Sequence, residues 1–416
     1  RAHIFSRFAT AKSVRPEMSF KLCPPSPPTD PTVRHIHPPA GSAKENSMSK
    51  PKLIIIGGGA AGLTLARDKQ LTAAADVTLI DAKPFLEFTP YALRAAVQPE
   101  WGAKHVVYNY CVPGATLKVG SVAEVDAVAN VVRMEDGATL PFDHLVVASG
   151  SSSHSAVSKT SPQCPSVAAR VDEYKAAYEE LSQVQHVLVV GGGTTAVEWA
   201  AEVKSAFPDK QVTMVHSGPA LLHFLKKTSS NKAHKFMDKH GVKVILNDKV
   251  HAEDGSSGPW ATEKGVPIPS GKAYLMTGVK PNTKFMPSSA VDDKGQIKVD
   301  DSLALSPQIG SKNPIYAVGD CSNSKDAKMW YAAGAQANWL KVSLLNDISQ
   351  KKGKKRLYKP AAPGPNPPVQ VITLGPADGI MQTPLGVFGG WLPRKMKSAG
   401  TPGSMMMSIA ESFRGG

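Results

Sequence analysis

Two glycine-rich loops, each placed directly after a short apolar run, restrict the fold of this chain more than any other feature. The first stretch, LIIIGGGAAGLTLARD, covers residues 53–68, and the second, VLVVGGGTTAVEWAAE, covers residues 187–202. Continuous apolar runs of this length are typical of strands buried on both faces of a parallel sheet. Glycine allows close approach of the backbone to a phosphate, and the N-terminus of a following helix favours negative charge. Each stretch therefore predicts a β-α-β unit that binds a dinucleotide.

The first loop has the pattern G-x-G-x-x-G, with Gly57, Gly59 and Gly62 at the glycine positions. The next predicted strand, residues 76–81, ends in Asp81, which lies 19 residues after Gly62. A carboxylate at this place can hold the hydroxyl groups of a ribose. Strand, loop, helix and acid in this order favour a dinucleotide site over a glycine turn that binds nothing.

The second loop reads G-x-G-x-x-A, with Gly191, Gly193 and Ala196. The following strand, residues 211–217, ends in His216 and Ser217 and carries no acid there. An acid would repel a ribose 2′-phosphate, whereas His or Ser tolerates it, so NADH and NADPH both remain open. Two loops suggest two dinucleotides, one of which donates a hydride to the other. A regulatory nucleotide site or a degenerate second loop is the alternative.

The remaining pattern predicts an α/β fold with two Rossmann-like dinucleotide-binding domains, the second inserted in the first, and a small C-terminal α+β segment. Hairpins are expected at 131–142 and 369–382, a buried parallel strand at 144–150, and a helix at 328–345. A strand at 315–318 leads into Gly319 and Asp320, where an aspartate can bond the ribityl chain of a flavin, although a plain Gly-Asp turn is the alternative. The expected boundaries are 1–47 for a leader, 48–155 and 280–347 for the first domain, 156–279 for the second, and 348–416 for the C-terminal segment.

The net charge of +14 is concentrated at the two ends of the chain. Residues 1–47 carry net +4 and residues 347–416 carry net +7, which argues against a nucleic-acid-binding body. A basic tail can be drawn to an anionic membrane or can be a solvated tail. Residues 1–15 resemble a mitochondrial presequence, and Met48 is the alternative start. The expected location is cytoplasmic or membrane-peripheral, or mitochondrial if residues 1–47 are a presequence.

The four cysteines, Cys23, Cys111, Cys164 and Cys321, lie far apart and form no C-x-x-C or metal-ligand spacing. The segment after Asp81, residues 82–97, contains no cysteine. Thiol–disulfide chemistry needs two thiols within reach of each other, so this pattern argues against it. The sequence also predicts no metal site.

Four motifs occur in the order seen in flavoprotein reductases that hold two dinucleotides: IIIGGGAAGL (54–63), VVASG (146–150), VVGGGTTAVEWAAE (189–202) and IYAVGDC (315–321). With ALRAAV (92–97), TGVKPN (277–282) and LYKP (357–360), the chain resembles the ferroptosis suppressor branch, the apoptosis-inducing-factor-like mitochondrion-associated oxidoreductases. The resemblance covers about residues 50–390 and is weakest at 218–270. Single-subunit NADH:quinone reductases are similar at a greater distance.

The resemblance implies noncovalent FAD, NADH or NADPH as hydride donor to the flavin, and a quinone as acceptor of the electrons. It also implies site residues. Those expected at FAD are Gly57, Gly58, Gly59, Ala60, Ala61, Gly62, Asp81, Arg94, Val122, Gly150, Gly319 and Asp320. Those expected along the nicotinamide coenzyme are Gly191, Gly193 and Glu198, and the catalytic assignments are Glu198 and Lys359, the latter near flavin and acceptor.

Two other functions remain open beside quinone reduction: a redox-gated binding protein like apoptosis-inducing factor, and a reductase of a small ferredoxin or rubredoxin. The oligomeric state, monomer or homodimer, is also open. The stretch VFGGWLPRKMK (387–397) has aromatic and basic residues that suit a bilayer surface. Alternatively, Val387, Phe388 and Trp391 pack on the flavin domain.

Overall fold

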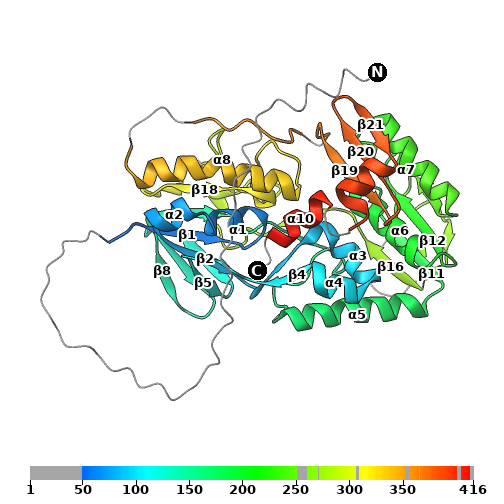
Figure 1. Ribbon diagram of the computed structural model, residues 1–416, viewed down its shortest axis with the longest axis horizontal. Coiled ribbons are helices and arrows are strands. Elements are labelled where there is room, and N and C mark those ends of the chain that lie inside the picture. The colour runs from blue at the N-terminus through cyan, green and yellow to red at the C-terminus, as the bar shows by residue number, and fades with distance from the viewer. Residues whose placement is uncertain are drawn as a thin grey trace, which may run out of the picture.

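The computed structural model describes residues 49–250, 260–269, 271–305, 309–351, 356–364, 366–400 and 404–412. The expected leader at 1–47 and most of the basic run KKGKKR (351–356) lie outside the described residues. The described chain forms two parallel sheets with helices against them, and a small antiparallel sheet follows near the C-terminus (Figure 1).

The first parallel sheet is built around the strand that precedes the first glycine loop. Its strands in spatial order are β18 (Ile315–Ala317), β9 (His144–Val147), β1 (Lys52–Ile56), β2 (Asp76–Asp81) and β5 (Thr116–Val119). Alternate β1 side chains enter two cores, because successive residues of a strand point to opposite faces. Leu53 and Ile55 pack in the large core, which also takes in apolar side chains of α1 (Ala60–Ala66) and α8 (Trp330–Ile348). Ile54 and Ile56 belong to the smaller core on the other face.

That smaller core is covered by a three-stranded antiparallel sheet of β6 (Val122–Asp126), β7 (Val131–Met134) and β8 (Thr139–Pro141). The expected hairpin at 131–142 is confirmed, since β7 and β8 pair antiparallel. Its turn contains Gly137 at φ +85°, a left-handed conformation that favours glycine.

The second parallel sheet repeats the arrangement around the second glycine loop. Its strands in spatial order are β13 (Lys243–Leu246), β12 (Gln211–His216), β11 (His186–Val190) and β16 (Lys272–Leu275). Its helices are α5 (Val167–Gln183), α6 (Thr194–Ala206) and α7 (Lys227–Lys239). Because β18 of the first sheet follows this whole unit in the chain, the second unit is an insertion in the first. The expected α/β class is confirmed.

Short elements connect and cover the two units. They are α2 (Lys69–Ala74), β3 (Phe85–Glu87), η2 (Thr89–Tyr91), α3 (Ala92–Val97), α4 (Pro99–His105), β4 (Val107–Asn109), β10 (Ser151–Ser153), β14 (Trp260–Ala261), β15 (Pro267–Ile268), β17 (Val279–Pro281), η3 (Ser288–Ala290) and η5 (Gly319–Cys321). The two chain crossings between the units, β10 and β17, pair antiparallel with each other. This pairing fixes the connection at the point where the chain leaves the first unit and returns.

A buried ion pair also joins the two units. Arg170 of α5 contacts Glu87 of β3, with Nη2 and Oε1 2.6 Å apart and both side chains almost fully buried. Tyr174 donates its hydroxyl to the same carboxylate oxygen at 2.7 Å. A buried carboxylate without partners is costly, so these contacts hold α5 in one position against the first unit.

The C-terminal segment forms an antiparallel sheet of β19 (Gln370–Leu374), β20 (Asp378–Thr383) and β21 (Gly386–Gly389), which confirms the expected hairpin at 369–382. The chain continues through α9 (Trp391–Pro393), the π-helical turn η6 (Arg394–Ser398) and α10 (Met405–Ser412). The sheet lies against α6 and α7 of the second unit, as the adjacent red and green ribbons show (Figure 1). Among the described residues, no helix combines the length and the hydropathy needed to cross a membrane.

Candidate active site

The two glycine loops have the same backbone geometry. In each unit, the first glycine donates its N–H to the second strand, from Gly57 to Ile80 at 2.7 Å and from Gly191 to Val215 at 2.8 Å. Both glycines have a positive φ, +102° and +133°, which side chains rarely tolerate. The loops therefore leave their strands in the same way.

Close packing explains some of the glycines, and open space explains others. A Cβ on Gly57 would lie 2.4 Å from the carbonyl oxygen of Ala148, and one on Gly62 would lie 1.8 Å from that of Gly57. By contrast, a Cβ on Gly59, Gly150 or Gly193 would meet no heavy atom of the described chain within 4 Å. The first glycine loop therefore packs tightly against its own sheet on one side and is open on the other. A loop that binds a phosphate needs this arrangement.

Asp81, at the end of β2, holds the first loop in this shape. Its Oδ2 accepts a hydrogen bond from the Gly58 N–H at 2.6 Å, and its Oδ1 accepts one from the Lys83 N–H at 2.8 Å. The carboxylate is only 9% exposed and borders the cavity beside the loop. Its expected contact with a ribose stays a prediction, because the structure shows the carboxylate bonded to the chain itself.

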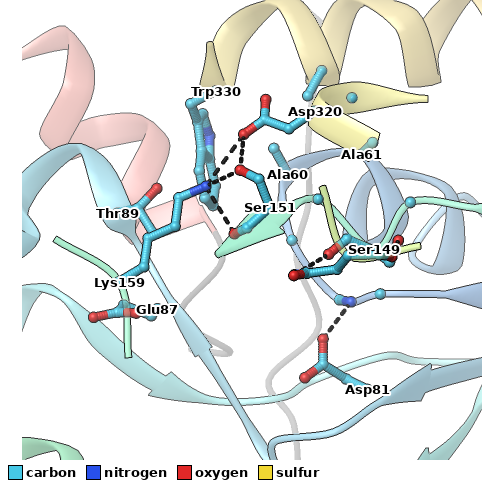
Figure 2. Close-up of a pocket in the computed structure, with 18 of the residues that line it drawn as sticks. Ala60, Ala61, Asp81, Glu87, Thr89, Ser149, Ser151, Lys159, Asp320 and Trp330 are labelled. Carbon is cyan, nitrogen blue, oxygen red and sulfur yellow. Dashed lines mark hydrogen bonds and ion pairs between the residues drawn. The ribbon is translucent and has the colours of Figure 1, made fainter. Parts of the chain in front are cut away.

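The first cavity, of about 180 Å³, lies over the first glycine loop. Most of the residues expected at FAD meet here although they come from distant parts of the chain (Figure 2). Those that line it are Gly57, Gly58, Gly59, Ala60, Ala61, Asp81, Gly150, Gly319 and Asp320. The open side of the loop and the buried polar groups around it fit an anionic dinucleotide such as FAD.

Asp320 shares this cavity with a lysine, Lys159, that belongs to none of the sequence motifs. Lys159 Nζ lies 3.2 Å from Asp320 Oδ2 and donates to Ser151 Oγ at 2.7 Å, while Ser151 Oγ donates to Asp320 Oδ2 at 2.7 Å (Figure 2). The three groups form one hydrogen-bonded cluster. Lys159 stands alone in a serine-rich loop, so no residue pattern could have singled it out.

A second and larger cavity, of about 770 Å³, lies beside the start of α6. Gly193 and Glu198, two of the residues expected at the nicotinamide coenzyme, line it. Four residues line both cavities, and we call them the shared wall: Thr89, Lys159, Met329 and Trp330. The two predicted dinucleotide sites therefore meet, rather than opening onto opposite sides of the molecule.

Glu198 is fixed in the second cavity by the C-terminal segment. Its Oε1 accepts hydrogen bonds from the Thr373 N–H at 2.8 Å and from Lys397 Nζ at 2.7 Å. The side chains of Glu198 and Lys397 are only 13% and 11% exposed. No sequence motif singles out Lys397, because nothing in the sequence places it opposite Glu198, which lies 199 residues earlier.

Apolar side chains from both units and from the C-terminal segment make up most of the second cavity's wall. They are Leu93, Phe224, Met276, Val279, Val369, Val371, Met396, Met405, Met406 and Ile409, in addition to Met329 and Trp330 of the shared wall. Lys328 and Tyr331 add polar groups at the start of α8. Burial lowers the pKa of the Lys328 ammonium, which donates to the Ser322 carbonyl.

Arg94, which the resemblance placed at FAD, lies elsewhere and lines neither cavity. Its Nη2 contacts Glu202 Oε1 at 2.6 Å, and both side chains are 3% exposed. Burial raises the pKa of the Glu202 carboxyl, so a cation beside it is needed to keep it charged. The guanidinium therefore pairs with a carboxylate on the buried side of α6, and the expected contact of Arg94 with FAD stays a prediction.

Lys359, expected near flavin and acceptor, is exposed and lines neither cavity. Its neighbour Tyr358 takes the inward position instead, with its ring against Trp339 of α8 and its N–H bonded to the Asp301 carbonyl at 2.6 Å. Lys397 and Lys159 are the lysines that line the second cavity together with Lys328. The catalytic assignment of Lys359 is therefore not supported.

Three further expected residues lie next to the cavities rather than in their walls. Val122 begins β6 and lies opposite Met134. Gly62 allows α1 to pack closely on the first glycine loop, and Gly191 allows the second loop to pack against Met276. Their expected contacts with coenzymes stay predictions. Cys321, next to Asp320, is fully buried in the smaller core, and its thiol contacts the carbonyls of Val147 and Val318.

The aromatic side chains of Phe388 and Trp391 do not pack on the first unit, the one expected to bind the flavin. Phe388 is 41% exposed and Trp391 is 72% exposed, whereas Val387 is half-buried against the core. Their sheet rests on the second unit. The alternative that all three pack on the flavin domain is therefore wrong.

The model of the family described as pyridine nucleotide-disulphide oxidoreductase matches residues 51–337. Among curated proteins, apoptosis-inducing factor homolog B of Dictyostelium discoideum is 30% identical, over 84% of this chain and 94% of that protein. Ferroptosis suppressor protein 1 of Mus musculus is 28% identical, over 79% of this chain and 88% of that protein. These relatives confirm the resemblance that the motifs indicated.

A solved structure with a similar fold is NDH2 from Plasmodium falciparum in complex with NADH. It has a TM-score of 0.67 and 16% sequence identity, over 87% of this chain and 97% of that one. At this identity the likeness supports the fold alone.

Proposed function

The chain belongs to the pyridine nucleotide-disulphide oxidoreductase family and is an FAD-dependent NAD(P)H oxidoreductase, and we propose that its electron acceptor is a quinone. The observation that carries the proposal is the second cavity, which is large, mostly apolar and separated from the first cavity only by the shared wall. A quinone headgroup is flat and largely apolar and has two carbonyl oxygens. It therefore matches an apolar cavity that contains a few hydrogen-bond donors.

The first cavity is the proposed FAD site. Bound there, FAD supplies the two-electron chemistry that links the nicotinamide coenzyme to the acceptor. Asp81 keeps the glycine loop in the conformation that leaves Gly59 open, and Asp320 is held in position by Ser151 and Lys159. These residues bind and orient, and none of them needs to act as a nucleophile.

The shared wall is where charge has to be stabilised. Lys159 places its ammonium at this wall, next to Asp320, and Lys328 lies on the second-cavity side of the same wall. Fixed positive groups in a site that excludes water stabilise developing negative charge far better than they do in bulk solvent. We assign Lys159 and Lys328 this electrostatic role.

Methionines give the second cavity its adaptable surface. Met329, Met396, Met405 and Met406 border it from α8 and from the C-terminal segment. Methionine side chains are unbranched and polarisable, so they accommodate flat ligands of different size. The Lys328 ammonium has three N–H groups and gives one to the Ser322 carbonyl, so it can donate another to a carbonyl oxygen at the edge of this surface.

A quinone that resides in a lipid bilayer would need a contact between protein and membrane. The exposed apolar side chains of Leu385, Phe388 and Trp391 are followed in the chain by the exposed basic residues Arg394 and Lys395. Apolar and basic groups together suit a membrane interface. The proposal therefore includes peripheral membrane contact through this C-terminal tip, defined as residues 385–395.

An acceptor comparison tests the proposal. The purified flavin-loaded protein is reduced with NADH and then mixed with a short-chain quinone, ferricyanide, a ferredoxin or a disulfide dye. The quinone should react fastest, and Met406→Trp should slow the quinone reaction while ferricyanide reduction is unchanged. Val342→Trp, at a half-exposed position on α8, is the control. Faster reaction with the ferredoxin than with every quinone would show that the acceptor is a small electron-transfer protein.

A further inference from the structure

The histidine at the end of β12 occupies the position that Asp81 has in the first unit. The second strand of each unit reaches the same point, because Ile56 lies opposite Ile80 in one sheet and Val190 lies opposite Val215 in the other. The next residue is an aspartate in the first unit and His216 in the second. At this position a Rossmann-type unit contacts the adenosine ribose of its dinucleotide.

The structure places the ring of His216 directly against the second glycine loop. A Cβ on Gly192 would lie 2.4 Å from the imidazole carbons Cγ and Cδ2 of His216. The imidazole thus borders the loop in the place where Asp81 contacts the first loop. The loop has the shape for a coenzyme, but the group beside it is a titratable base instead of a carboxylate.

A second histidine stacks on the first. The rings of His216 and His223 are 5.3 Å apart at an angle of 27°, and His216 Nε2 lies 3.2 Å from His223 Nδ1. Leu222, next to His223, donates its N–H to the Gly192 carbonyl at 2.8 Å, so the loop that carries His223 is tied to the glycine loop. Phe224, on the other side of His223, lines the second cavity. His223 is therefore the chain neighbour of a residue in the cavity wall, although neither histidine lines the cavity itself.

From this arrangement we infer that His216 and His223 recognise a 2′-phosphate on the adenosine ribose, so that NADPH binding strengthens relative to NADH binding as the pH falls. This inference rests on the expected binding of the nicotinamide coenzyme at the second glycine loop, whose Gly193 lines the second cavity. An imidazolium is a charged donor, and hydrogen bonds from charged donors to phosphate are among the strong ones. A carboxylate in the same place would repel the phosphate.

The neighbouring groups in the described part of the chain leave the pair free to titrate. Burial, and then the charge of His223, lower the pKa of His216, which favours its neutral form when no anion is bound. Asp248 donates its N–H to the His216 carbonyl at 3.3 Å, while its carboxylate accepts from the Lys249 N–H at 2.9 Å. His234, beneath the same loop, accepts from the Leu221 N–H at 3.0 Å, and burial lowers its pKa.

The sign of the pH effect follows from these contacts. A bound phosphate dianion favours the imidazolium, so binding a 2′-phosphate is coupled to proton uptake by the pair. The coupling strengthens binding as the pH falls from about 8 towards 6, the range in which an imidazole group ordinarily takes up its proton. A nucleotide with free 2′ and 3′ hydroxyls gains nothing from the added charge.

Calorimetric titration of the flavin-loaded protein with adenosine 2′,5′-bisphosphate and with 5′-AMP tests the inference without any turnover. The two probes differ only in the 2′-phosphate. We expect the bisphosphate to bind about tenfold more tightly than 5′-AMP near pH 6, the equivalent of one charge-assisted hydrogen bond, and this ratio to decrease towards about pH 8. His216→Asp should reduce the ratio to about one or below, and His223→Gln should flatten its pH dependence.

His154→Gln, at an exposed histidine after β10, is the matched control and should leave the ratio unchanged. Since His216→Asp alters a half-buried position, thermal unfolding of each variant shows whether it is folded, and the exposed His223→Gln variant tests the inference independently. A ratio that does not change with pH in the unmodified protein overturns the inference, as does failure of both probes to bind. If the acceptor proves not to be a quinone, these binding results do not change. Failure of the quinone proposal and failure of the 2′-phosphate inference can therefore be told apart.

Discussion

Lys397 Nζ donates a hydrogen bond to Glu198 Oε1 at 2.7 Å, and this contact joins the C-terminal segment to the helix that follows the second glycine loop. Two residues of the first unit hold the same turn: the Tyr91 hydroxyl donates to the Lys397 carbonyl at 2.9 Å, and Arg94 donates to the Ser398 carbonyl. The turn η6 is therefore bonded to both units. Its position completes the second cavity, which Met396 and Lys397 line.

We predict that Glu198→Gln loosens this turn and weakens coenzyme use. The amide oxygen can still accept from the Thr373 N–H, but the largely buried ion pair with Lys397 is lost, at a cost of about 1–3 kcal/mol. Proteolysis within residues 384–412 should accelerate, and kcat/KM for NADH should fall by roughly tenfold to a hundredfold. Limited proteolysis and steady-state kinetics measure the two effects.

Lys397→Met provides the matched comparison, because it breaks the same pair from the other side and leaves the Glu198 carboxylate in place. If Glu198 acts on the coenzyme itself, Glu198→Gln should lower kcat/KM much more than Lys397→Met does. Equal losses in both variants would mean that the ion pair only holds the turn. Unchanged kinetics in both variants would contradict a role for Glu198 in the second cavity.

We predict that Arg94→Met lowers stability strongly but leaves flavin content per folded molecule unchanged. The substitution strands the Glu202 carboxylate in the interior, which costs about 3–5 kcal/mol. Chemical unfolding and the ratio of flavin to protein absorbance measure both quantities. The double variant Arg94→Met/Glu202→Met should regain most of the stability, since it removes the buried charge. A flavin-free but stable Arg94→Met protein would instead support the original expectation that Arg94 contacts FAD.

The sequence predicts best those features that local patterns determine. The two glycine loops, the strands that precede them, the hairpins and the residues around the first cavity follow from periodicity and from the restricted conformations of glycine. Nine expected residues, Asp320 included, meet in the first cavity because parallel strands end at the same edge of a sheet. Such patterns repeat along one segment, so a single sequence contains them in full.

The sequence predicts least well those side chains whose position depends on long-range packing. Arg94 and Lys359 are both basic and near expected motifs, yet one pairs with Glu202 in the interior and the other faces solvent. Lys159 and Lys397 were missed because their partners, Asp320 and Glu198, lie 161 and 199 residues away in sequence. The charge on a lysine is visible in the sequence, but the carboxylate that it meets is decided by the tertiary fold.

We predict that the protein loses stability as the pH falls below about 6.5, the ordinary pKa of histidine. Burial lowers the pKa of His144, at the start of β9, so the unfolded chain takes up its proton at a higher pH than the folded protein does. Proton uptake by the unfolded chain favours unfolding, with a slope of at most about 1.4 kcal/mol per pH unit for one group. His144→Gln should reduce this slope in urea unfolding series, whereas the exposed-site variant His154→Gln should not. An identical slope in His144→Gln would show that other groups dominate.

We predict that the C-terminal tip supplies the membrane contact. Replacing Leu385 and Trp391, which are 76% and 72% exposed, with serine removes apolar surface without opening the core. The double variant should lose association with anionic liposomes in a flotation assay and keep its activity with a short-chain quinone. Val128→Ser, at another exposed apolar residue, is the control. Liposome association equal to that of the unmodified protein would assign the contact to a different surface.

We propose that the coenzyme and the flavin react at the shared wall, where the two predicted dinucleotide sites meet. Anaerobic mixing of the flavin-loaded protein with NADH, and separately with NADPH, measures this directly through the visible absorbance of the flavin. We expect rapid bleaching by at least one coenzyme and full recovery of the absorbance band when a quinone is added. Bleaching should be much slower in Thr89→Trp, because the larger side chain would obstruct the space between the two cavities while the flavin stays bound. Flavin that remains oxidised with both coenzymes in folded, fully loaded protein would contradict the account.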